Sequence, residues 1–163
     1  SPGFKVNFSR TYNSKDNKEF TGLGRGWTFG FEGKIKKEDS LTMVYLPNGA
    51  TQVFKTGSNG KYEAYDNRSN LKKNADNTHI LTTKDNYKYG YGVDGYITWM
   101  EDRLGNRLLI EHEAGKVKKI TDTVGRVYTV TYTDDLITKI TLPQLSDDAT
   151  IPMEITYTYE NGK

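Results

Sequence analysis

Residues suited to acid–base or nucleophilic chemistry are scarce in this 163-residue chain. His79 and His112 are its only histidines, and cysteine is absent. The sequence holds no Gly-x-Ser-x-Gly elbow, and no Ser-His-Asp arrangement can be assembled from it. Two histidines without cysteine also make a poor zinc site. We therefore predict a protein that is not an enzyme, with no catalytic residue, no metal site and no cofactor.

One glycine-rich segment has the look of a phosphate-binding loop. Gly22, Gly24 and Gly26 alternate with other residues and lead into Trp27. This spacing differs from the dinucleotide-binding motif, and no βαβ unit follows. A tight turn that delivers Trp27 into the core is the better interpretation.

Acidic and basic clusters fit exposed turns and strands better than ligand sites. The pairs Asp134-Asp135 and Asp147-Asp148 lack the alternating spacing of a calcium loop. With a net charge of +2, the chain is not predicted to bind nucleic acid. Lysines that alternate along strands are typical of solvated faces and protected edges; here they are Lys34, Lys36, Lys37, Lys116, Lys118 and Lys119.

Aromatic residues provide the strongest alternative to a purely structural role. Trp27 and Trp99, together with 12 tyrosines, are able to form a flat platform on which sugar rings stack. The competing interpretation, which we favour, is that Trp99 packs between neighbouring hairpins. Exposed, coplanar rings would indicate carbohydrate binding, and buried rings would indicate packing.

The elements that position these residues are predicted to be β-strands. Helical periodicity is nearly absent, β-branched and aromatic residues alternate with polar ones, and Asn-Gly or Asp-Gly pairs recur between the runs. The polar segment 68–77 is predicted to be a loop or a weak strand. The predicted strands are 5–12, 27–36, 41–46, 51–55, 61–65, 79–83, 87–91, 96–101, 107–112, 117–121, 127–132, 137–142 and 153–159.

Length and composition point to one domain covering residues 1–163. The hydrophobic fraction of 34% is low for a globular chain, where about 45–50% is usual by a count that includes glycine, and a low fraction suits thin sheets and open shells. No apolar run approaches the roughly 18 residues of a membrane span. We interpret both ends as cut points in a longer chain.

The C-terminal half contains an internal repeat. The pattern Gly95-x-Ile-x-x-Met-x-Asp102-x-x-Gly105 recurs 20 residues later as Gly115-x-Val-x-x-Ile-x-Asp122-x-x-Gly125. A third copy begins at Asp135 and departs from the pattern at Leu142, where Pro143 follows and Leu145 takes the glycine position; residues 144–150 are interpreted as an insertion. A period of this length is typical of a solenoid or an array.

Each copy is predicted to form one hairpin. The spacing of three between the apolar residues of the first strand indicates a bulge. The second strand alternates, and Tyr132 stands where the previous copy has His112, so we interpret His112 as a substitute for tyrosine. In the turn, aspartate is expected to accept backbone hydrogen bonds and glycine to supply the left-handed residue; the turn residues are Asp102, Gly105, Asn106, Asp122, Gly125 and Arg126.

This repeat resembles the YD repeat of Rhs proteins. The family includes bacterial Rhs and wall-associated proteins, shell subunits of insecticidal toxin complexes and the YD shell of teneurins. The N-terminal half is also similar, because Arg10-Thr-Tyr12-Asn-Ser14 and Gly22-x-Gly24-x-Gly26-Trp27 resemble the opening that precedes Rhs repeats. Leu46-Pro47-Asn48-Gly49 resembles the short repeats that follow it. On this basis we divide the chain into an opening at 1–93 and YD-type repeats at 94–163.

The resemblance implies an all-β fold in which consecutive antiparallel hairpins of about 20 residues form a curved, partly open sheet. In the family, such sheets build a shell that encloses a C-terminal toxin or effector, or supports an adhesion surface. We therefore expect a non-catalytic wall segment of a secreted or cell-surface protein, near the start of its shell. The expected partners are the rest of the shell, its enclosed domain and further copies through sheet edges, with glycans as the alternative.

Overall fold

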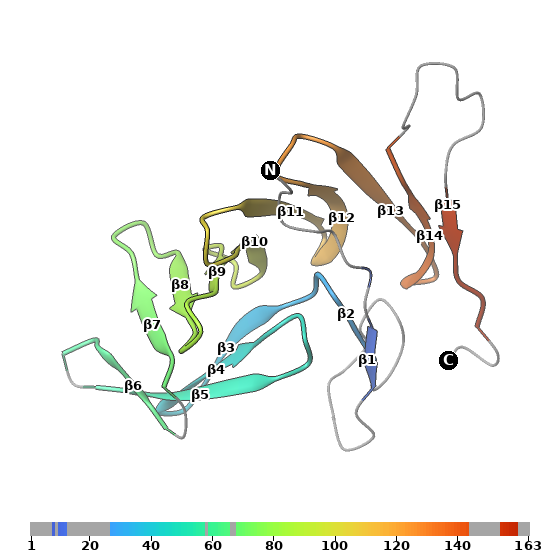
Figure 1. The fold of residues 1–163 in the computed structure, drawn as a ribbon. Coiled ribbons are helices and arrows are strands. Elements are labelled where there is room, and N and C mark those ends of the chain that lie inside the picture. Colours follow the sequence, from blue (N-terminus) through green and yellow to red (C-terminus); the bar gives the residue numbers. More distant parts are fainter. Residues whose placement is uncertain are drawn as a thin grey trace.

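The computed structural model describes residues 8, 10–12, 27–57, 59–65, 68–143 and 154–159. This part of the chain contains strands and turns and no helix (Figure 1). It therefore has no helix long and apolar enough to cross a membrane. The strands are β1 (Arg10–Tyr12), β2 (Trp27–Phe29), β3 (Lys34–Glu38), β4 (Leu41–Tyr45), β5 (Thr51–Thr56), β6 (Tyr62–Ala64), β7 (Asn70–Lys73), β8 (His79–Thr82), β9 (Lys88–Tyr91), β10 (Ile97–Glu101), β11 (Arg107–Glu113), β12 (Lys116–Thr121), β13 (Val127–Thr133), β14 (Leu136–Thr141) and β15 (Glu154–Thr156).

Neighbours in sequence are neighbours in each sheet. β1 and β2 form a two-stranded sheet, β3 to β6 form a four-stranded sheet, and β7 to β15 form a nine-stranded sheet in sequence order. Every pairing is antiparallel, so the chain advances by consecutive hairpins. The sheets are open and do not close into a barrel. The predicted fold class, all-β with consecutive hairpins in a curved and partly open sheet, is confirmed.

The nine-stranded sheet curves around the side on which β2 and β3 lie (Figure 1). Its core face is built by the strict alternation that antiparallel strands impose. In β11, Leu108 and Ile110 are 0% and 2% exposed, whereas Leu109 between them is 47% exposed. The same core cluster takes in Phe29 of β2 and Val44 of β4, so all three sheets contribute to it.

Phe8 connects the N-terminal segment to this core. Its ring lies 5.7 Å from that of Phe31 and 5.5 Å from that of Tyr128, measured between centroids. Phe29 lies 5.4 Å from Phe31 in an edge-to-face contact. Aromatic side chains thus fill the space between β2 and the repeat strand β13, and they provide large apolar area in a chain with few aliphatic residues.

A bulge recurs in the first strand of each copy of the repeat. The register shifts leave one residue of β10, β12 and β14 without a partner on the preceding strand: Thr98, Lys118 and Thr138. These positions are 20 residues apart. The predicted bulge is confirmed, and it explains why apolar residues three apart in the sequence, such as Val117 and Ile120, both reach the core at 2% and 0% exposure.

One turn type recurs along the chain. In each case the first residue accepts a hydrogen bond from the N–H three residues on and donates to the carbonyl four residues on, and the fourth residue has positive φ. This is the type I turn with a left-handed bulge residue that three-residue hairpin loops favour. It spans residues 46–50, 57–61, 74–78, 83–87, 92–96, 102–106 and 122–126.

The structure differs from the predicted strands at residues 27–36. The single strand expected at 27–36 is two strands, because the chain turns between Phe29 and Lys34. Glu32 stabilises that turn: its backbone N–H donates to the Phe29 carbonyl at 2.9 Å, and its carboxylate accepts from the Phe29 N–H at 2.7 Å. Segment 68–77, predicted as a loop or weak strand, contains β7, which Leu71 anchors to the core at 4% exposure.

Some predicted features lie outside the described residues. They are residues 5–7 and 9 of the strand predicted at 5–12, the glycine-rich segment 22–26, the insertion 144–150 and the pair Asp147-Asp148. The strand predicted to resume after the insertion is present as β15.

The four-stranded and nine-stranded sheets are joined by backbone contacts. The Ile35 N–H donates to the Gly95 carbonyl at 2.8 Å, and the Ile97 N–H donates to the Gly33 carbonyl at 2.9 Å. The hydroxyl of Tyr91, which is 1% exposed, donates to the Tyr45 carbonyl at 3.0 Å. The start of β3 is therefore covered by the turn between β9 and β10.

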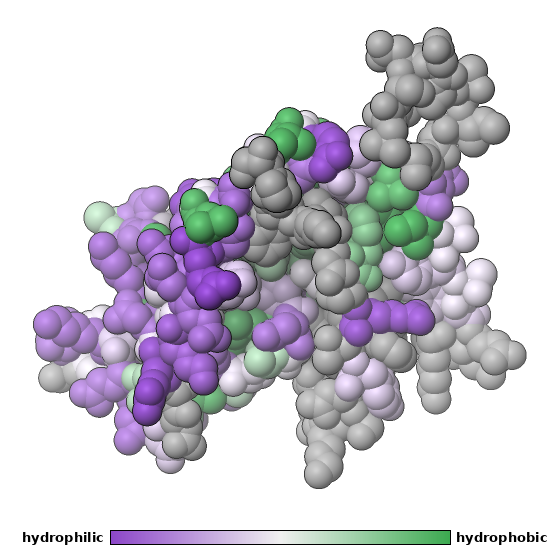
Figure 2. Space-filling model, in the orientation of Figure 1, coloured by the Kyte–Doolittle hydropathy of each residue, from purple (hydrophilic) through white to green (hydrophobic). Residues whose placement is uncertain are grey.

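The visible surface is mostly polar. Figure 2 shows hydrophilic residues over the side of the molecule that carries β5 to β8, with hydrophobic residues in small, separate groups. Exposed apolar side chains include Leu104 and Val124, which stand at equivalent positions of two repeat turns. Scattered exposure of this kind is normal for a folded domain.

Candidate functional site

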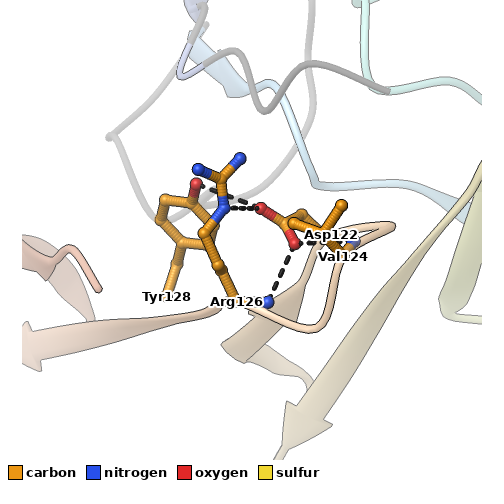
Figure 3. Close-up of polar contacts among 4 residues, drawn as sticks. All are labelled: Asp122, Val124, Arg126 and Tyr128. Carbon is orange, nitrogen blue, oxygen red and sulfur yellow. Dashed lines mark hydrogen bonds and ion pairs between the residues drawn. The ribbon is translucent and has the colours of Figure 1, made fainter. Parts of the chain in front are cut away.

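The carboxylate of Asp122 is the centre of the best-connected polar cluster in the repeats (Figure 3). Asp122 is only 5% exposed. Its Oδ1 accepts hydrogen bonds from the N–H groups of Val124 at 3.1 Å and Arg126 at 2.8 Å. Its Oδ2 accepts from Arg126 Nε at 2.7 Å and from the Tyr128 hydroxyl at 3.4 Å. The carboxylate therefore holds the whole turn from 122 to 126.

The turn at Asp102 repeats this arrangement one copy earlier. Oδ1 accepts from the N–H groups of Leu104 at 2.9 Å and Asn106 at 3.0 Å, and Oδ2 accepts from the Asn106 side-chain amide at 3.0 Å. Asn106 and Arg126 thus play the same part with different chemical groups. The structure brings the six predicted turn residues together as two separate turns on the same rim of the sheet, and the carboxylates face their own turns.

Electrostatics keep both aspartates ionised. The side-chain hydrogen bond from Asn106 lowers the pKa of Asp102. Burial raises the pKa of Asp122, but hydrogen bonds from Arg126 and Val124 outweigh burial, so the pKa lies below its usual value. In turn, the Asp122 carboxylate raises the pKa of Arg126. A carboxylate whose lone pairs accept from its own turn has little capacity left for a metal or a substrate.

Gly105 and Gly125 complete the turns through backbone conformation. Their φ angles are +84° and +87°, the left-handed region that residues with a Cβ rarely adopt. A Cβ at either position would meet nothing within 4 Å. Glycine is therefore needed here for conformation and not for space.

A tyrosine in or just after the second strand supports the bulge in the two later copies. The hydroxyl of Tyr132 donates to the Val117 carbonyl at 2.7 Å, and the hydroxyl of Tyr159 donates to the Ile137 carbonyl at 2.6 Å. Both carbonyls lie directly before the bulged residue, where the strand ladder is interrupted. No such role was predicted from the sequence, although the recurring tyrosines near the ends of the later second strands were the available signal.

His112 occupies the tyrosine position in the first copy. It is half-buried, and its ring centroid lies 5.2 Å from that of Tyr96. Burial lowers the pKa of His112, and the nearby Asp94 carboxylate partly opposes the effect. Its neighbours are those of a packed strand residue.

His79 lies between the four-stranded and nine-stranded sheets. The Tyr62 hydroxyl is 3.1 Å from His79 Nε2, and the two rings meet edge to face. Burial and, to a lesser extent, the charge of Lys73 lower the pKa of His79. His79 and His112 are carried by different strands and have different neighbours.

Trp99 is covered on the outer face of the sheet. The Arg107 guanidinium lies 3.8 Å from the ring centroid. A Cβ at Gly90, its cross-strand neighbour, would fall 1.9 Å from Trp99 Nε1, so the indole lies directly on the Gly90 backbone. This is packing between neighbouring strands, with glycine making room for the ring. The side chain of Trp27, the other predicted stacking residue, lies outside the described residues.

Several charged side chains of the predicted clusters form ion pairs with neighbouring residues on the surface of the sheets. Lys119 is 3.6 Å from Glu111 and Lys36 is 3.1 Å from Glu38, while Lys116 forms an ion pair with Asp135. Asp134 and Asp135 both have positive φ and form the tight turn between β13 and β14. Within the described ranges, no group of three or more metal-binding side chains is gathered in one place.

A family model matches the N-terminal part of the chain. The model of a family described as a domain of unknown function, DUF6531, matches residues 1–54. No curated protein matches the chain. The matched region ends within β5 and does not reach the repeats. The chain is therefore similar, over β1 to β5, to a domain family whose own function is undetermined.

Proposed function

We propose that this chain is a non-catalytic wall segment of a YD/Rhs-type β-shell, in a secreted or cell-surface protein whose shell encloses a C-terminal toxin or effector. The observation that carries the proposal is the recurrence of one structural unit, a strand with a bulge, a turn held by aspartate and a second strand, at 95–114 and again at 115–134. The bulge recurs a third time in β14. Neighbouring units bury a continuous core, as repeat architectures do.

The use of the repeat's polar residues supports a structural role. Asp122 directs both oxygens to its own turn, and the Tyr132 hydroxyl binds a backbone carbonyl of its own hairpin. Side chains that carry out chemistry normally converge on a shared pocket with perturbed pKa values. Here the repeated side chains are spread along the sheet, one set per hairpin.

The family match lies inside the proposed opening at 1–93. Residues 1–54 match a family model, and the 20-residue units begin only at Gly95. The turn at 92–96, which connects β9 and β10, is hydrogen-bonded to β3 of the four-stranded sheet. In this proposal the repeats begin at that turn.

Duplication of one unit tests the shell proposal. A second copy of residues 115–134 inserted after Asp134 is expected to give a folded protein with a higher free energy of unfolding, because the new hairpin stacks on both neighbours. Urea unfolding followed by tyrosine fluorescence measures the change. The matched control carries the same insertion with aspartate replaced by alanine in the added turn, and it should gain less.

Loss of folding on insertion of the unaltered unit would contradict the proposal, because a compact, non-repetitive domain does not accept an extra hairpin in its core. In the full parent protein, limited proteolysis should leave the C-terminal domain protected until the shell is cut. Early release of that domain would argue against enclosure.

The alternative function is a carbohydrate-binding module that uses exposed tryptophan and tyrosine. Trp99 is the described candidate, but Arg107 and the Gly90 backbone flank its ring. A glycan array separates the two proposals. A signal that Trp99→Ala abolishes, with the fold retained, would favour the carbohydrate module over the wall segment.

A further inference from the structure

Two turns of the four-stranded sheet place an asparagine directly before a glycine. Asn48 and Asn59 occupy the same position in the recurring turn, and both are exposed. Each Oδ1 accepts a hydrogen bond from the N–H two residues on, at 2.9 Å from Ala50 and 3.1 Å from Lys61. We propose that Asn59 is a site of spontaneous deamidation, and that the turn around Asn48 protects Asn48 from the same reaction.

The reaction needs only water. The Gly60 backbone nitrogen loses its proton to solvent and attacks Asn59 Cγ, forming a C–N bond. The bond from Cγ to the side-chain nitrogen then breaks, and ammonia leaves with a proton from solvent. Water opens the resulting succinimide at either carbonyl, giving aspartate or isoaspartate. Glycine favours the attack because it has no side chain to shield the nitrogen, and the space around a Cβ at Gly60 is empty.

The two turns differ in how firmly the strands hold them. The glycine N–H donates to the first residue of the turn in both cases, and this bond must open before the nitrogen can attack. At Asn48 the acceptor is Leu46, which is 2% exposed, and the flanking strands pair from Leu41–Lys55 to Tyr45–Thr51. At Asn59 the acceptor is Gly57, and the flanking pairs run only from Phe54–Ala64 to Thr56–Tyr62.

Turn opening therefore costs more at Asn48 than at Asn59. β6 is a three-residue strand at the end of its sheet, and local opening is easiest where few backbone hydrogen bonds and little buried apolar area must be disrupted. Because attack occurs from the open state, the deamidation rate follows the population of that state.

The same turn elsewhere in the chain shows that the aspartate product fits. Asp76 and Asp94 occupy the asparagine position in their turns, and their Oδ1 atoms accept from Thr78 N–H at 3.0 Å and Tyr96 N–H at 3.1 Å. Aspartate at position 59 is therefore expected to preserve the turn and add one negative charge. Isoaspartate lengthens the backbone by one methylene and is expected to loosen the β5–β6 hairpin.

Peptide mapping by mass spectrometry tests the assignment. The folded protein is incubated in mildly alkaline buffer at physiological temperature, and a parallel sample is incubated in concentrated urea. We expect Asn59 to convert several-fold faster than Asn48 in the folded protein, and the two to convert at similar rates in urea. Asn106, which precedes Arg107, is the internal reference for an asparagine without a following glycine.

Equal rates at Asn48 and Asn59 in the folded protein would overturn the proposal, as would conversion of Asn59 no faster than that of Asn106. Two variants separate chemistry from folding. Gly60→Ser should slow the reaction at Asn59 without affecting Asn48, and Asn59→Asp should keep the free energy of unfolding of the parent chain. Loss of stability in Asn59→Asp would show that the aspartate product does not fit.

Discussion

At the scale of single residues, Asp122 and Asp102 accept hydrogen bonds in equivalent turns but differ in how deeply their side chains are buried. Asp122 is buried and binds Arg126 and Tyr128 as well as two N–H groups, whereas the Asp102 carboxylate is more accessible to water. Water can replace a lost partner at an accessible turn but not at a buried one. The two copies of the motif should therefore respond differently to the same change.

Asp122→Ala is expected to lower the free energy of unfolding by about 2 kcal/mol, because it removes the charged acceptor that binds two N–H groups of the turn and the Arg126 side chain. Asp102→Ala should cost less, and Asp85→Ala, in an exposed turn where Thr83 provides the side-chain acceptor, should be nearly neutral. Urea unfolding of the three variants measures the order. An Asp102 variant as damaging as the Asp122 variant would show that burial does not set the cost.

The pH dependence of stability should report on His112. Because burial lowers the pKa of His112 in the folded state, the unfolded state binds the proton more readily. The free energy of unfolding is therefore expected to fall as the pH drops below the unfolded value of about 6.5. His112→Tyr should reduce this slope. Thermal unfolding at a series of pH values measures it, and an unchanged slope would assign the effect to His79 alone.

At the scale of elements, bulges and turns determine how the hairpins repeat. The bulge residues recur at the same place in β10, β12 and β14, and each bulge rotates the following residues so that two apolar side chains three apart both face the core. The tyrosine hydroxyl then binds the carbonyl before the bulge in the two later copies. Bulge and tyrosine therefore act as one unit.

Tyr132→Phe is expected to destabilise the protein by about 1 kcal/mol, the usual net value of one hydrogen bond. Amide hydrogen exchange should increase most in β12 and β13. Tyr65→Phe is the control, because Tyr65 is 58% exposed and keeps its ring. If both variants were equally stable, the hydroxyl at Tyr132 would not support the bulge.

The contact between Trp99 and Gly90 should appear as strong coupling between two strands. Gly90→Ala is expected to destabilise the wild-type background, since the new methyl group would overlap the indole. In a Trp99→Ala background the same change should cost much less. A double-mutant cycle on urea unfolding gives the coupling. Additive effects would mean that the indole does not lie on the Gly90 backbone.

At the scale of the whole molecule, the two larger sheets share one core but only a small backbone connection. The Tyr91 hydroxyl provides one of the few hydrogen bonds between them that are not backbone to backbone. Tyr91 is 1% exposed, so its hydroxyl has little access to water and relies on the Tyr45 carbonyl as its acceptor. The stability of the contact between the two sheets is therefore expected to depend on the Tyr91 hydroxyl.

Tyr91→Phe is expected to cost about 1–2 kcal/mol, because the Tyr45 carbonyl loses a buried donor. Hydrogen exchange should rise in β3 and β4 more than in β12 to β14, which are distant from the joint. Tyr65→Phe, with the ring 58% exposed, is the control. A uniform rise in exchange would indicate that the two sheets unfold as one unit.

The sequence by itself determined the strand type, the hairpin order and the 20-residue unit, because alternation, turn residues and the spacing of Asp102, Gly105 and their later copies are local. It missed the division of 27–36, which depends on Glu32 binding back to Phe29. The tertiary structure alone decided that the Trp99 ring lies between Gly90 and Arg107, and that Tyr132 serves the bulge. These contacts join residues on different strands, and their geometry follows from register and curvature, which no local pattern encodes.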